Sequence, residues 1–249
     1  MRNITLSLAL LLGSVGSPAA PVDLPKAEAI LDKFVAVTGG EAAYRKHHSK
    51  FSSGTVEIVG TGITGTVLDY HAEPNFSYME MSFPTIGDSR QGTDGNVAWV
   101  IPPSGGAKVK QGDERAMGIM AARFNSEIHW RELYKRVETV GTESVEGKPA
   151  YIVVMTPQQG KPVTEFFDVR SKLLVKLILK EQAGTGDQRI EVSVGDYRQE
   201  GGVAEPHQIT QKVGAMTFIM RRDTFRFNEE PPKGIFDPPA EVKALLGKR

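Results

Sequence analysis

Between residues 51 and 227 the chain is dominated by short segments in which apolar and polar residues alternate, separated by short turn-forming links. Alternation is typical of β-strands with one buried face, because successive side chains of a strand point to opposite sides. The spacing favours antiparallel strands over repeated βαβ units. We expect about ten or eleven strands. Because so long a sheet must curl to protect its edges, we predict a mainly β fold, a curled antiparallel sheet or open half-barrel with helices packed in the hollow.

Helices are expected at both ends of the chain and in its middle. Asp23 and Pro25 are good residues for a helix start, apolar residues follow at helical spacing as far as residue 37, and a Gly-Gly pair ends the run. Further helical segments are predicted at 41–48, 112–124, 128–135 and 241–246. These helices could pack in the hollow of the sheet.

The first 19 residues resemble a secretory signal peptide. Arg2 provides the positive charge, residues 4–15 the apolar stretch, and residues 17–19 a cleavage site of small residues. We therefore predict export to the periplasm and a single domain over residues 20–249. No later apolar run is long enough for a transmembrane segment.

Composition excludes several classes of function. The chain contains no cysteine, so it has neither disulfides nor thiolate chemistry. Without its first 19 residues it has 29 basic and 30 acidic side chains, whereas nucleic-acid-binding proteins usually carry a basic excess. We expect no nucleic-acid partner, no cofactor and no metal, and we expect a monomer.

Catalytic motifs are weak. Residues 60–65 (GTGITG) match the dinucleotide-binding pattern by letters, but a strand follows where that motif needs a helix, so we interpret them as a hairpin. His129, beside Trp130 and near two glutamates, is the one candidate general base. We assign no catalytic residue and predict that the protein is not an enzyme.

Apolar strand faces carry the clearest functional signal. Met79 and Met81 share one face, Met216 and Met220 share another, and a predicted helix carries two further methionines. Methionine adapts to ligands of different shape, whereas rigid cores favour Leu, Ile and Val. An apolar cavity explains this pattern, and an ordinary solid core explains it equally well. The predicted cavity residues are Met79, Met81, Phe83, Trp99, Ile101, Met117, Met120, Phe124, Met155, Leu177, Leu179, Met216, Phe218 and Met220.

Several stretches resemble the LolA/LolB-like superfamily of periplasmic lipoprotein carriers and their relatives. They are 30–34 (ILDKF), 38–40 (TGG), 94–99 (DGNVAW), 130–135 (WRELYK), 146–151 (EGKPAY), 167–168 (FD), 173–175 (LLV), 196–198 (DYR) and 236–239 (FDPP). The resemblance implies an open half-barrel with helices in its hollow and a hydrophobic cavity for acyl chains. In the carriers an arginine helps to hold a helical lid closed; no arginine of this chain is assigned that role.

The leading hypothesis is a periplasmic, non-enzymatic carrier or binding protein for lipid or lipoprotein acyl chains. One alternative is a docking or sensing module with a solid core that binds another envelope protein. The other is a hydrolase or isomerase that uses the hollow as an active site, with His129 as its base.

Overall fold

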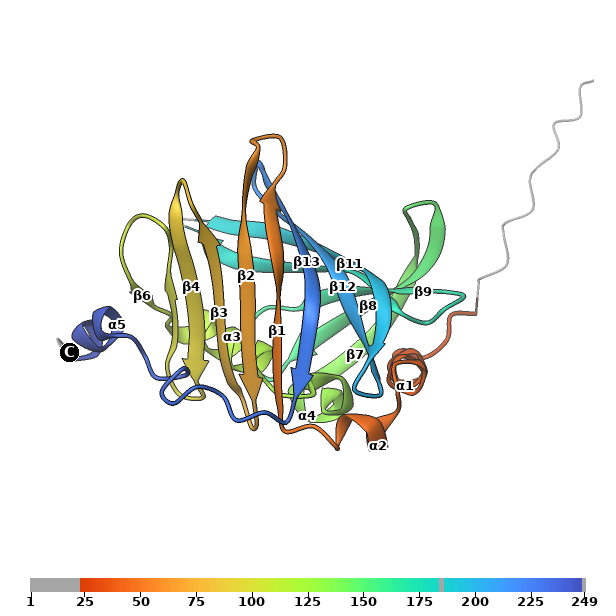
Figure 1. Cartoon of the computed structure of the whole chain (residues 1–249). Helices are drawn as coiled ribbons and strands as arrows, with labels where there is room; N and C mark the ends of the chain where they lie inside the picture. Colours follow the sequence, from red (N-terminus) through yellow and green to blue (C-terminus); the bar gives the residue numbers. More distant parts are fainter. Residues whose placement is uncertain (1–22, 184–185, 248–249) are drawn as a thin grey trace, which may run out of the picture.

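The computed structural model describes residues 23–183 and 186–247, which contain one sheet of thirteen antiparallel strands (Figure 1). The expected number of ten or eleven was too low. The predicted signal peptide lies outside the described residues. The strands are β1 (Ser49–Ile58), β2 (Ile63–Ala72), β3 (Phe76–Phe83), β4 (Gly87–Asp94), β5 (Ala98–Ile101), β6 (Lys108–Val109), β7 (Tyr134–Val145), β8 (Lys148–Pro157), β9 (Val163–Asp168), β10 (Leu174–Ala183), β11 (Gly186–Glu200), β12 (Val203–Val213) and β13 (Met216–Phe227).

The strand order shows that the sheet is open. It runs β6-β5-β4-β3-β2-β1-β13-β12-β11-β10-β9-β8-β7, so the first and last strands of the chain pair in its centre, while β6 and β7 form its two edges. The sheet curls so that the half that contains β2 to β6 faces the half that contains β7 to β12 (Figure 1). The prediction of an open antiparallel half-barrel is therefore confirmed, whereas a closed barrel is not formed.

The helices largely follow the predicted segments. They are α1 (Ala27–Val37), α2 (Glu41–Tyr44), α3 (Gly112–Ala121), the 3-10 turn η1 (Ser126–Ile128), α4 (Trp130–Leu133) and α5 (Ala240–Leu246). Helix α1 begins four residues after the predicted start at Asp23, and Tyr134 already belongs to β7. None of the helices in the described part of the chain is long and apolar enough to cross a membrane.

Glycines build the hairpin that the dinucleotide-like letters suggested. Gly60 and Gly62 both have positive φ, at 78° and 71°, and β2 starts at Ile63 where a nucleotide-binding motif would start a helix. Glycine adopts this left-handed region without steric cost. The hairpin interpretation is confirmed.

Cross-strand pairing divides the side chains of the sheet into two faces, because directly opposed residues point to the same side. Val56 of β1 is opposed by Gly65 of β2 and by Met220 of β13. Followed from strand to strand, the same register joins this face to Val153 of β8, which packs against Ile30 of α1. We call this side the concave face and the other the convex face.

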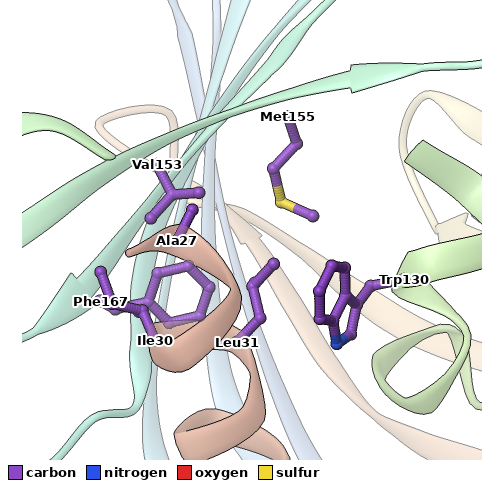
Figure 2. Close-up of a cluster of buried hydrophobic side chains, with 7 residues drawn as sticks. All are labelled: Ala27, Ile30, Leu31, Trp130, Val153, Met155 and Phe167. Carbon is purple, nitrogen blue, oxygen red and sulfur yellow. The ribbon is translucent and has the colours of Figure 1, made fainter. Parts of the chain in front are cut away.

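Part of the concave face is closed by helices. Ala27, Ile30 and Leu31 of α1 and Trp130 of α4 form a cluster with three side chains of β8 and β9, each at most 6% exposed (Figure 2). These strand residues are Val153, Met155 and Phe167. We call these seven residues the helix-covered cluster. Phe34 adds an edge-to-face contact with Phe167, with ring centroids 5.4 Å apart. It is a solid core, as the dense packing of protein interiors requires.

The convex face carries a cluster of its own. Tyr78, Trp99 and Val242 of α5 are buried together, and Ile235 and Phe236 pack against them. The C-terminal segment therefore covers the outside of β2–β6. Figure 1 shows α5 beside β6.

Candidate ligand-binding hollow

A third apolar cluster lies on the concave face of the central strands, and it differs from the other two. Every member, buried or partly buried, comes from a strand, so no apolar helix side chain in the described chain packs against it. We call it the open patch. Its members are Val56, Ile58, Ile63, Val67, Met79, Met81, Phe83, Ile209, Phe218 and Met220.

Five predicted cavity residues meet in the open patch: Met79, Met81, Phe83, Phe218 and Met220. The register also places Met216 on the concave face, at the start of β13, where its side chain is 52% exposed. Leu177 and Leu179 of β10 lie on the same face and are half-buried. The methionine pattern on β3 and β13 thus marks one continuous surface.

Other predicted cavity residues lie elsewhere. Trp99 and Ile101 are on the convex face, where Trp99 is 1% exposed beneath the C-terminal segment, so neither can line the hollow. Met155 belongs to the helix-covered cluster. Phe124, just after α3, is buried, whereas Met117 and Met120 of α3 are half-buried.

Residue Gly160 shows how α3 reaches across the hollow. A Cβ atom at this position would lie 2.6 Å from the Met117 sulfur. A side chain there would displace the Met117 side chain, and the φ of 97° at this position also favours glycine. Lys110, before α3, also reaches across to Glu181 of β10, at 3.8 Å.

The concave face becomes polar toward the end of the sheet where α2 and α4 lie (Figure 1). Arg222 of β13 forms an ion pair with the buried Asp69 of β2 at 2.7 Å, and the Ser52 hydroxyl donates to the same carboxylate oxygen at 3.2 Å. Nearby, Lys50 pairs with Glu205 at 2.9 Å. Asp69 is directly opposite Met79 of the open patch, so polar and apolar regions meet on adjacent residues.

Glu165 stands apart from these pairs. The register places it on the concave face between Val153 of β8 and Leu177 of β10. Burial, and to a lesser extent the charge of Glu127, raises the pKa of Glu165 to about 7. Burial likewise raises the pKa of Glu127. A carboxyl group on an apolar wall is costly to ionise, which is the physical reason for these shifts.

His71 lies among the ion pairs of this polar end. Burial, opposed in part by Asp69, lowers the pKa of His71 to about 4. The imidazole is therefore neutral at pH 7. Sequence reasoning assigned no role to these titratable groups, although the spacing of Val67, Asp69 and His71 already places a carboxylate and an imidazole beside an apolar residue on one strand face.

His129, the one candidate base from the sequence, makes only local polar contacts. Its Nδ1 atom lies 3.1 Å from the exposed carboxylate of Glu132 and 3.4 Å from Arg123. Arg123 also approaches Glu132, at 3.5 Å, so the three side chains form a small ion cluster beside α4.

Two pockets lie outside the open patch. One, of about 160 Å³, lies where Phe51 and Tyr70 meet Pro231 and Pro232. The other, of about 230 Å³, separates α1 from α4, with Val35 and Trp130 among its lining residues. None of the residues lining either pocket belongs to the open patch.

No protein-family model matches the sequence, and no curated protein sequence shows significant similarity to it. Solved structures do match over most of the chain. A DUF1329 family protein from Desulfovibrio piger has a TM-score of 0.56 at 12% identity, with 85% of this chain and 97% of that chain covered. A LolA superfamily protein from Nitrosomonas europaea has a TM-score of 0.55 at 12% identity, covering 86% and 99%.

The chain has a LolA-like fold. A domain from Vibrio parahaemolyticus described as an outer membrane lipoprotein-sorting protein supports the same conclusion, with a TM-score of 0.54, 11% identity and coverage of 88% and 97%. The resemblance noted in the sequence is confirmed at the level of the fold. Within this LolA-like half-barrel, the open patch is the apolar cluster of the concave face whose described members all come from strands.

Proposed function

We propose that this protein is a non-enzymatic carrier that binds the acyl chain of a lipid or lipoprotein against the open patch. The observation that carries the proposal is that, among the described residues, no apolar helix side chain joins this cluster, whereas helix side chains join the other two apolar clusters. Partly buried methionines and Phe218 offer adaptable apolar contacts there. The lipoprotein-sorting description of a structural neighbour is consistent with this choice.

The energetics suit reversible binding. Burial of each methylene of an acyl chain contributes about 0.8 kcal/mol, so a chain of roughly 15 methylenes gains about 12 kcal/mol over water. A membrane offers a similar gain, so transfer between membrane and hollow is nearly balanced and needs no energy source in the carrier. We further propose that the carrier works in the periplasm, on the basis of the predicted signal peptide.

Displacement of a fluorescent fatty acid tests the proposal. Phe218→Asn, in the open patch, should raise the dissociation constant by about tenfold, because it places an amide against the bound chain. Ile219→Asn is the matched control, since Ile219 is the next residue of β13 and points to the convex face. Thermal melts would show that both variants are folded.

Either of two results would contradict the carrier. The first is no displacement and no lipid in native mass spectra of the parent protein at micromolar concentration. The second is an equal loss of affinity in both variants. A docking module with a solid core, which binds another envelope protein, would give the first result together with capture of a specific partner.

A further inference from the structure

The links that join the strands at one end of the sheet, as distinct from its edge strands β6 and β7, are almost free of charge. Because every neighbouring pair is antiparallel, six links lie at the same end of the strands. They are β1–β2, β3–β4, β5–β6, β8–β9, β10–β11 and β12–β13. The five whose residues are fully described read VGTG (59–62), PTI (84–86), PPSGGA (102–107), QQGKP (158–162) and GA (214–215). Their one charged residue, Lys161, is ion-paired with Asp187. We call this end of the sheet the neutral rim.

The links at the opposite end of the strands include charged residues. These are Glu73, Glu146, Arg170 and Lys172. Helices α1, α2 and α4 also lie toward that end of β1, β2 and β13 (Figure 1). Turn-forming glycines occur at both ends of the sheet, so the requirements of tight turns do not explain why charge is missing from the neutral rim.

Exposed apolar side chains gather on the neutral rim. Ile86 is 41% exposed, Val59 is 45% exposed and Met216 is 52% exposed, and they sit at the ends of the β3–β4, β1–β2 and β12–β13 hairpins. These hairpins are consecutive along the sheet. The Val59 amide donates to the Thr217 carbonyl at 2.9 Å, which fixes two of the tips beside each other.

The rim is continuous with the open patch. Ile58 and Ile63 flank the β1–β2 tip, Phe83 ends β3, and Phe218 lies two residues from Met216. An acyl chain that leaves the patch in this direction meets uncharged loops and exposed aliphatic side chains, whereas the other direction leads past the ion pairs of Asp69 and Lys50.

We infer that the neutral rim docks on the surface of a lipid bilayer, with Val59, Ile86 and Met216 inserted at the boundary between headgroups and acyl chains. Neutral loops with protruding apolar side chains match this boundary, because the inserted residues Val59, Ile86 and Met216 carry no charge that must be desolvated. The inference rests on the carrier proposal only for the direction in which the ligand passes. Docking itself is measurable without any ligand in the hollow.

Flotation with phosphatidylcholine vesicles tests the inference. The parent protein should bind these uncharged vesicles, with little change between low and high salt, because no charge pairing is involved. A triple variant, Val59→Asp with Ile86→Asp and Met216→Asp, should lower the vesicle partition coefficient by at least about tenfold. The double variant Val59→Asp with Ile86→Asp leaves Met216 of the concave face in place, and its affinity for a fluorescent fatty acid in vesicle-free solution should stay within about twofold of the parent value.

Val140→Asp is the matched control, because Val140 of β7 is 55% exposed and lies away from the rim. It should leave both measurements unchanged. The single variant Val59→Asp, tested in the same way, replaces the triple variant if the latter fails to fold.

Three results would overturn docking. They are parent protein that binds the fatty acid but not the vesicles, binding that needs anionic lipid and low salt, and a triple variant that floats like the parent. Loss of self-association in the triple variant, without loss of flotation, would assign the rim to a second copy of the chain. Failure of the parent to bind the fatty acid would instead reject the carrier proposal.

Discussion

The helix-covered cluster and the open patch lie on the same concave face, and both contain methionine, yet they differ in what completes them. In the first, α1 and Trp130 supply the missing layer, and Met155 is 2% exposed. In the second, all described apolar members come from strands, and Met79 and Met81 stay partly exposed. An apolar sheet face is therefore a stabilising core where a helix covers it and a candidate binding surface where none does.

The largest expected effect belongs to the helix-covered cluster. Phe167→Ala removes a fully buried ring that contacts Phe34, and it should lower the free energy of unfolding by about 4 kcal/mol. Fatty-acid affinity, measured where the variant is still folded, should not change. Urea unfolding provides the stability, and a loss below about 1 kcal/mol would remove the distinction between the two regions.

The border between the open patch and the polar end should be sensitive to unpaired charge. Arg222→Met leaves Asp69 buried without its cation, which should cost about 3 kcal/mol. Adding Asp69→Asn should recover much of this loss. Arg198→Met is the control, because its partner Asp196 is exposed and such surface pairs contribute less than about 1 kcal/mol. Equal losses in the two single variants would show that the Arg222 pair is solvated.

Glu165 gives the smallest and most pH-dependent effect. Its native pKa of about 7 is raised above the ordinary value of 4.5, so the native state binds this proton more tightly than the unfolded chain does. The stabilisation is fully present below pH 4.5 and is lost as the pH rises through 7. Glu165→Gln should therefore match the parent at pH 4.5 and exceed it at pH 8 by on the order of 2 kcal/mol.

Urea unfolding at the two pH values measures this difference, with the exposed Glu146→Gln as control. Equal stability of parent and Glu165→Gln at pH 8 would mean that the carboxyl group is hydrated, and that the wall around it is more open than the structure indicates.

The sequence predicted this architecture well where alternation is long and missed it where alternation is short or two-sided. Strand β6 has only two residues, too few to show a period, and this contributed to the low strand count. Trp99 and Ile101 alternate with Ala98 and Val100, which are apolar as well, so the pattern cannot show which face is concave. The C-terminal helix, more than a hundred residues later, decides it.

The candidate site shows the same division. Spacing alone placed Met79 and Met81 on one strand face and Met216 and Met220 on another. The structure brings Met79, Met81 and Met220 into one patch. Glu165 could not be recognised, because the flanking residues Val163, Phe166 and Phe167 make both faces of β9 apolar. That no helix side chain of the described chain joins the patch is a property of tertiary packing, which no local sequence pattern contains.

The most direct test of the account uses the lack of cysteine in the chain. Met81→Cys and Ser82→Cys each introduce one site for an environment-sensitive fluorophore, on neighbouring residues of β3 that face the open patch and the convex side, respectively. Titration with a lysophospholipid should give a saturable blue shift at residue 81 and none at residue 82. No shift at residue 81, or the same shift at both positions, would contradict binding of acyl chains in the hollow.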